Sequence, residues 1–240
     1  MERKFQFSLG EYYHIYSRGV AKSTLFYNEK DYRRFMSLLY LANAEKSFHI
    51  SNLQNLAYQD LFGIERGKIL TNVGCYCLMP NHFHLLLRET GEEGISRFMG
   101  KLLTGYSMYF NVNRKRSGPL FVKPFRARHV NSDLYLKYLF AYIHLNPLSI
   151  KFPKWQNEIR DMDLEKAENF LKSYKHSSYF DFLDLKRVEG SILDRQVFPG
   201  YFQKPKDFSD FVREWVEIKR SYQGEPSLIS EGSLISEGSP

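Results

Sequence analysis

Two strand-like runs joined by a short turn are the feature that most limits what this chain can fold into. Residues 69–79 and 82–88 each have the length and apolar content of a β-strand, and Pro80-Asn81 between them is typical of a turn. The pattern therefore predicts a β-hairpin at the centre of the fold.

The segments around this hairpin predict two further strands and three helices. Residues 12–17 are rich in strand-forming side chains, and residues 121–130 are expected to form a fourth strand. Apolar residues at helical spacing predict helices over 28–46, 95–110 and 133–146, the last ended by Pro147. This order of elements is typical of an α+β fold in which helices pack on one face of an antiparallel sheet.

The chain is expected to have three parts. Residues 1–150 contain all the predicted strands and form the main domain, whereas 151–222 read as a small helical extension. Residues 223–240 repeat Ser-Leu-Ile-Ser-Glu-Gly twice and are predicted to be a disordered tail. Residues 47–67 show no clear periodicity and are interpreted as an insertion.

Composition favours a cytoplasmic protein that does not span a membrane. No apolar run approaches the roughly 18 residues that a membrane helix needs, and the first residues lack the apolar stretch of a signal peptide. Cys75 and Cys77 are two apart in a predicted strand and poorly placed for a mutual disulfide, so we expect buried thiols.

Positive charge is concentrated in the main domain. The net charge is +7, and residues 1–150 carry 20 Lys or Arg against 11 Asp or Glu. Between residues 94 and 132 no acidic residue occurs, and the basic ones are Arg97, Lys101, Arg114, Lys115, Arg116, Lys123, Arg126 and Arg128. A polyanion is the natural partner of such a stretch, although a solvated basic face without a partner remains an alternative.

His82-Phe83-His84 is the strongest chemical signal in the sequence. Because side chains alternate along a strand, both imidazoles project from one face and Phe83 from the other. Two imidazoles so placed can bind one divalent ion and leave positions open for a third ligand and a substrate oxygen. A His-x-His pair alone is also compatible with purely structural histidines.

Tyr142 and Asn146 form a second candidate group near the end of the last predicted helix of the main domain. Residues four apart share a helix face, so the tyrosine hydroxyl and the asparagine amide can point to one place. An amide oxygen suits Mg²⁺ or Mn²⁺, and with two histidines it would complete a partly open site. Spacing alone does not choose between Tyr135, Tyr138 and Tyr142, which could also form a packing stripe.

These motifs together resemble a known family, the single-tyrosine HUH transposases, and in particular the REP-associated tyrosine transposases of bacteria. The resemblance lies in Tyr76-Cys-Leu-Met-Pro-Asn-His-Phe-His-Leu-Leu-Leu, Gly118-Pro-Leu-Phe, Arg126 and Tyr142-Ile-His-Leu-Asn-Pro, with Tyr174-Lys-His-Ser-Ser-Tyr extending it to about residue 180. It implies a ferredoxin-like HUH nuclease fold, with His82, His84 and Asn146 as ligands of Mg²⁺ or Mn²⁺ and Tyr142 as the nucleophile.

The resemblance also implies an activity: cleavage and rejoining of single-stranded or hairpin DNA through a 5′-phosphotyrosine, by a homodimer, with a monomer left open. Basic side chains would then neutralise the DNA backbone, namely Arg18, Arg114, Lys115, Arg116, Lys123, Arg126 and Arg128. A hairpin- or repeat-binding regulatory protein without transposition activity is the main alternative. An initiator of replication or conjugation is another, and a zinc hydrolase would leave Tyr142 and Asn146 unexplained.

Overall fold

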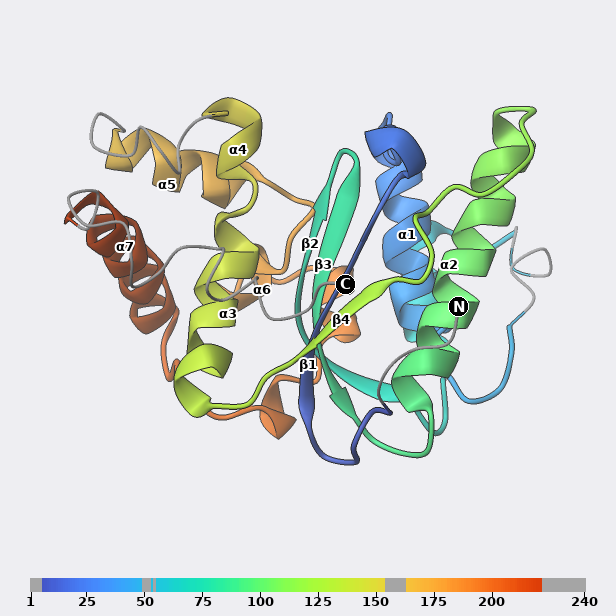
Figure 1. The fold of residues 1–240 in the computed structure, drawn as a ribbon, viewed down its shortest axis with the longest axis horizontal. Helices are drawn as coiled ribbons and strands as arrows, with labels where there is room; N and C mark the ends of the chain where they lie inside the picture. The colour runs from blue at the N-terminus through green and yellow to red at the C-terminus, as the bar shows by residue number, and fades with distance from the viewer. Residues whose placement is uncertain (1–5, 49–52, 54, 154–162, 222–240) are drawn as a thin grey trace.

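An antiparallel sheet of four strands lies at the centre of the molecule (Figure 1). The computed structural model describes residues 6–48, 53, 55–153 and 163–221. The sheet order is β2-β3-β1-β4, with bounds β1 (Tyr12–Arg18), β2 (Thr71–Met79), β3 (His82–Glu89) and β4 (Arg126–His129). The β2–β3 hairpin is the one that the sequence predicts, and β4 is shorter than expected.

Helices cover both faces of this sheet. On one side lie α1 (Glu29–Leu41) and α2 (Gly94–Asn113). On the other lie α3 (Asp133–Leu145), α4 (Leu148–Lys151), α5 (Leu164–Ser173), α6 (Tyr179–Phe182) and α7 (Pro205–Ser221). Short 3₁₀ turns occur at Val20–Lys22, Tyr58–Gly63, Val188–Ile192 and Arg195–Val197. The α+β class and the antiparallel sheet are confirmed, but the prediction that helices pack on one face is wrong.

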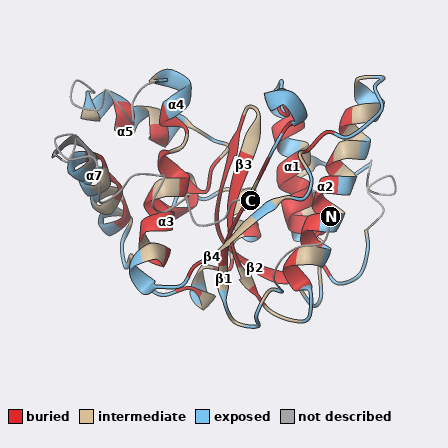
Figure 2. Cartoon of the chain, viewed as in Figure 1, coloured by how far each residue is buried: buried red, intermediate tan, exposed pale blue. Residues whose placement is uncertain are grey.

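The physical reason is that β2 is apolar on both faces. Tyr76 and Leu78 point into the core beneath α1 and α2, whereas Cys75 and Cys77 point into a second core beneath α3. All nine residues of β2 are buried, and Figure 2 shows the β2–β3 hairpin mostly red between the two helical layers. A strand apolar on both faces needs a layer on each side to exclude water. The two cysteines are free and buried, as predicted.

Local sequence signals set the helix starts. The Asn28 side chain accepts a hydrogen bond from the Asp31 amide at 3.2 Å, and Ser132 accepts one from the Tyr135 amide at the same distance. Both are N-caps, which satisfy amides that the first turn of a helix leaves without a partner. Asn146 is the C-cap of α3, so Pro147 follows the helix end as expected.

The stretch expected as a helical extension contributes α5, α6 and α7 to the second core. Phe182, Phe208 and Val212 are buried there with residues of α3. The proposed boundary at residue 150 stays a prediction. The repeat at 223–240 lies outside the described residues, as do 49–52 and 54 of the expected insertion. No helix in the described ranges is both long and apolar enough to cross a membrane.

Candidate DNA-processing site

The two histidines of the His-x-His motif lie on the sheet face that α3 covers. In the β1–β3 ladder Tyr16 is opposite His84 and Arg18 is opposite His82. Directly opposed residues of antiparallel strands share a face. Phe83 is fully buried in the core on the other side, so the alternation expected from the sequence is present.

A third histidine, His14 of β1, is hydrogen-bonded to one member of this pair, His84. Its Nε2 lies 2.9 Å from His84 Nδ1, and both side chains are buried. His82 places its own Nδ1 2.6 Å from the Asn81 side-chain oxygen, and its ring centroid is 5.1 Å from that of His84. The Nδ1 atoms of His82 and His84 therefore both have hydrogen-bond partners, and Nε2 is the nitrogen of each ring that could bind a ligand.

Burial keeps these imidazoles neutral. It lowers the pKa of His82 to about 4, helped by the positive charge of Arg18. It lowers the pKa of His84 well below the usual value, helped by the neighbouring His14 and His82. The pKa of His14 falls to about 3, through burial and then the charge of Arg128. A neutral imidazole keeps the lone pair that a metal ligand requires.

Tyr142 reaches this face from α3. Its ring centroid is 5.7 Å from that of His84 and 5.7 Å from that of His14, with an edge-to-face arrangement in both cases. The other two tyrosines of the helix are placed differently. Tyr135 lies beneath the Arg128 guanidinium, and the Tyr138 ring packs on Trp215 of α7 at 4.7 Å. Tertiary structure thus distinguishes three tyrosines that the spacing did not.

Asn146 sits one turn beyond Tyr142 and is tied to its own helix. Its amide nitrogen donates a 2.8 Å hydrogen bond to the Tyr142 carbonyl. The nitrogen is thereby committed to the backbone, and the amide oxygen remains the atom with which Asn146 could bind a cation.

The donor types present here, imidazole nitrogens and an amide oxygen, are ones that can bind a divalent ion. Two neutral imidazoles, each fixed through Nδ1, resemble metal-binding histidines whose second nitrogen is held by a hydrogen bond. Among the described residues no group of three or more His, Cys, Asp or Glu is arranged to hold a metal. The third ligand from this chain would accordingly be an oxygen of another type, as in Asn146.

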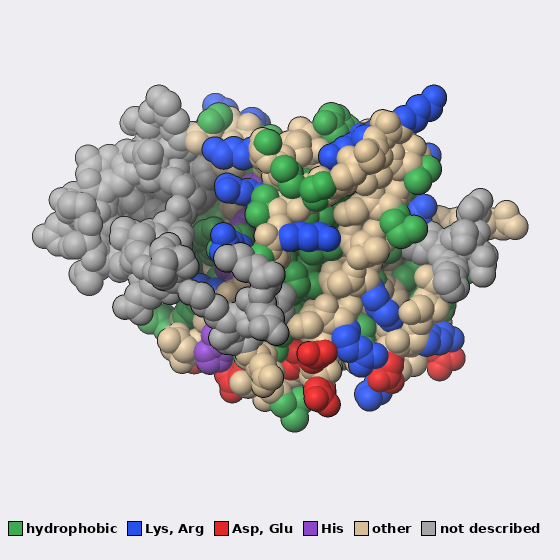
Figure 3. Space-filling model, turned by 45° about the vertical axis from the view of Figure 1, so that its right-hand side comes forward, with side chains coloured by type: hydrophobic (Ala, Val, Ile, Leu, Met, Phe, Trp, Pro, Cys, Tyr) green, Lys and Arg blue, Asp and Glu red, His purple; other side chains and the backbone are tan. Residues whose placement is uncertain are grey.

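The predicted basic residues separate into two groups. Arg126 and Arg128 of β4 are opposite Tyr16 and His14, on the histidine face, and Arg18 ends β1 beside His82. On the face drawn in Figure 3 several Lys and Arg side chains lie in a column left of centre, with histidine visible between them, and others are spread over the rest of that face. These three arginines place positive charge beside the histidines.

The second group surrounds the end of α2. Arg114 forms an ion pair with the buried Asp31 at 2.6 Å and lies over the Phe110 ring, so its main contacts stabilise the fold. Lys115 is exposed just after the helix, and Arg116 lies near Phe110 and donates to the Pro119 carbonyl. Lys123 is exposed in the segment before β4.

This chain is similar to a solved structure that carries DNA. It is described as "Structure of the REP associates tyrosine transposase bound to a REP hairpin", with 9% identity and a TM-score of 0.49 over 79% of this chain and 90% of that one. No protein-family model and no curated protein sequence matches the chain. Likeness at this level assigns no activity, so a function must be argued from the site residues themselves.

His14 is the site residue that the sequence did not reveal. It is 70 positions from His84, and only the pairing of β1 with β3 brings the two together. The available signal was alternation, because Tyr12, His14, Tyr16 and Arg18 share one face of β1 while Tyr13 and Ile15 fill the opposite core.

Proposed function

We propose that this chain is a metal-dependent DNA strand transferase that cuts single-stranded or hairpin DNA by attack of Tyr142. The observation that supports it best is the position of the Tyr142 ring against His84 and His14, on a face bordered by Arg126 and Arg128. We choose DNA as the substrate because the sequence motifs resemble those of the transposase family.

In this proposal the Tyr142 oxygen attacks the phosphorus of a phosphodiester. A bond forms between that oxygen and phosphorus, the bond to the 3′ oxygen breaks, and the hydroxyl proton of Tyr142 passes to solvent. The departing 3′ oxygen takes up a proton, so the products are a 5′-phosphotyrosine and a 3′-hydroxyl. The energy of the ester is retained, so a 3′-hydroxyl can later reverse the reaction and rejoin DNA.

His82, His84 and Asn146 would hold the divalent ion, and Arg18, Arg126 and Arg128 would hold the DNA backbone. A bound Mg²⁺ or Mn²⁺ supplies positive charge that stabilises the phosphate oxygens during attack. The arginines contribute affinity that depends on salt but not on sequence. One tyrosine per chain permits one covalent end at a time, so a homodimer would be required to join two ends.

The test is formation of a covalent adduct. Labelled single-stranded, hairpin and duplex oligonucleotides from the DNA flanking the gene are incubated with Mg²⁺, Mn²⁺ or EDTA and resolved on denaturing gels. We expect a metal-dependent adduct with unpaired DNA that is lost in Tyr142→Phe and retained in Tyr135→Phe, a matched change on the same helix. Tight hairpin binding without an adduct would instead favour the regulatory DNA-binding protein.

A further inference from the structure

A buried histidine fixes the far side of the helix that carries Tyr142. His144 of α3 is fully buried, with Nδ1 2.7 Å from the Phe140 carbonyl and Nε2 2.7 Å from the Ser178 hydroxyl. It lies two residues from Tyr142 and two from Asn146. Residues two apart on a helix are rotated by roughly 200°, so His144 is on the side of α3 opposite both site residues.

Ser178 belongs to a segment that extends the edge of the sheet. Residues 176–178 run antiparallel to β2, with the Leu78 amide bonded to the His176 carbonyl at 2.9 Å and the Ser178 amide to the Tyr76 carbonyl at 2.9 Å. The Tyr76 amide also donates to the Ser178 hydroxyl at 2.9 Å. One hydroxyl thus contacts the sheet and α3 at the same time.

The hydrogen bonds of this pair have one consistent direction. A carbonyl can only accept, so His144 donates from Nδ1 to Phe140. In the neutral ring Nε2 then accepts from the Ser178 hydroxyl at 2.7 Å, a shorter contact than the 3.2 Å from that hydroxyl to the Tyr76 carbonyl. The Ser178 oxygen in turn accepts from the Tyr76 amide. The side-chain polar atoms of both residues therefore have partners, and rotating α3 would break the bond from Ser178.

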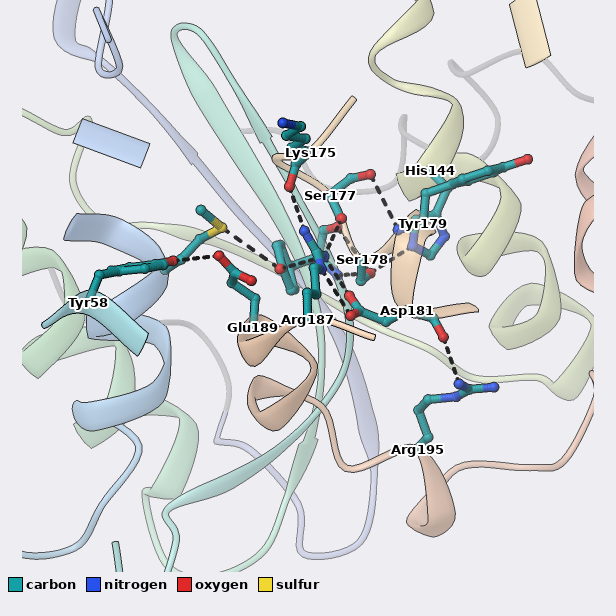
Figure 4. A network of polar contacts seen from close by, with 12 residues as sticks. Tyr58, His144, Lys175, Ser177, Ser178, Tyr179, Asp181, Arg187, Glu189 and Arg195 are labelled. Carbon is teal, nitrogen blue, oxygen red and sulfur yellow. Dashed lines mark hydrogen bonds and ion pairs between the residues drawn. The ribbon is translucent and has the colours of Figure 1, made fainter. Parts of the chain in front are cut away.

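Arg187 holds the segment against β2, as Figure 4 shows. Its guanidinium donates to the carbonyls of Lys175 and Ser177, each at 2.6 Å, and to the Tyr76 hydroxyl at 3.0 Å. It also forms an ion pair with Asp181 at 2.5 Å. The position of Ser178 is therefore fixed by contacts other than its hydrogen bond to His144.

We propose that His144 and Ser178 are a positioning pair that sets the rotation of α3 on the sheet and so aims Tyr142 and Asn146 at the histidine face. The inference rests on the proposed function, since it treats Tyr142 as the attacking group. Through this pair the segment at residues 176–178 helps to position the site, although neither residue of the pair touches DNA.

The chain provides a matched control for the test. Ser177 is as deeply buried as Ser178, but its hydroxyl accepts from the Tyr179 amide within its own segment and, among the residues that the structure describes, forms no hydrogen bond with α3. Ser178→Ala and Ser177→Ala therefore remove the same atom from neighbouring positions, and only the first removes the link to the helix.

Two measurements are made on both variants of the full chain. The first is the single-turnover rate of adduct formation beside the affinity for the same oligonucleotide. The second is the ¹⁹F NMR spectrum of protein with 3-fluorotyrosine at position 142, which reports the surroundings of that ring without requiring activity. Far-UV circular dichroism verifies that each variant is folded at the assay temperature.

We expect Ser178→Ala to slow adduct formation about 10-fold or more while affinity stays within about 2-fold, because reacting groups are sensitive to small misplacements. Its fluorotyrosine resonance should shift or broaden, whereas Ser177→Ala should match the wild type in both measurements. Equal resonances in the two variants would overturn the positioning role. If the wild type forms no adduct but the Ser178→Ala resonance still changes, the proposed activity fails and the positioning role stands.

Discussion

Replacing Arg187 with methionine should destabilise the protein strongly, because it leaves a buried carboxylate without its partner. The side chains of Arg187 and Asp181 are 14% and 6% exposed, and the guanidinium also serves two backbone carbonyls. Removing one partner of a buried ion pair costs about 3–5 kcal/mol. For a chain of this size each kcal/mol lowers Tm by roughly 2–4 °C, so we expect a loss of about 6–20 °C.

The assay is thermal and urea unfolding followed by far-UV circular dichroism. Arg213→Met is the matched control, since Arg213 forms an exposed pair with Glu217 at 3.6 Å and should cost about 0–1 kcal/mol. Combining Arg187→Met with Asp181→Asn should cost less than the sum of the single changes, because no buried charge then remains. The reasoning is refuted if Arg187→Met is no more destabilising than Arg213→Met.

Three further outcomes follow from the site and its surroundings. His14→Phe removes the hydrogen bond that orients His84, and should raise the Mg²⁺ or Mn²⁺ concentration for half-maximal adduct formation by about 10–100-fold; an unchanged metal titration would contradict the orienting role. Arg126→Ala should reduce the slope of log affinity against log salt by about 1 in oligonucleotide binding, while the exposed Lys68→Ala should leave it unchanged. Burial lowers the pKa of His176 to about 4, so between about pH 6.5 and 4 the unfolded chain binds a proton at this residue and the folded chain does not. The free energy of unfolding therefore decreases as pH falls through this range, by at most about 1.4 kcal/mol per pH unit, and His176→Phe should reduce that slope in urea titrations.

Several elements of the fold were predictable because their signals are local. The β2–β3 hairpin follows from two apolar runs and a Pro-Asn turn, and α3 follows from its cap Ser132 and the proline after its end. The shared face of His82 and His84 follows from the period of a strand alone. Such features depend on residues within a few positions of one another.

The prediction about the helical layers was wrong because the segment that covers the second face of the sheet is distant in the sequence. The continuous apolar run of β2 is compatible with burial on both faces, yet nothing in the sequence of that strand says which later segment covers the second one. The second face is covered by α3 and by the helices after residue 163. Phe182 and Phe208 of those later helices are buried in the same core as α3. Segments so distant in the chain meet only when the whole core forms.

By itself the sequence determined the strands, the main helices, the basic character of the main domain and the pairing of two histidines on one face. Tertiary structure decided the rest: that His14 bonds to His84 across the β1–β3 ladder, that Tyr142 rather than Tyr138 lies against the histidines, and that Arg114 pairs with Asp31. The physical reason is that local periodicity fixes the direction of a side chain relative to its own element. Strand register and helix rotation, set by the packing of both cores, determine what that side chain meets.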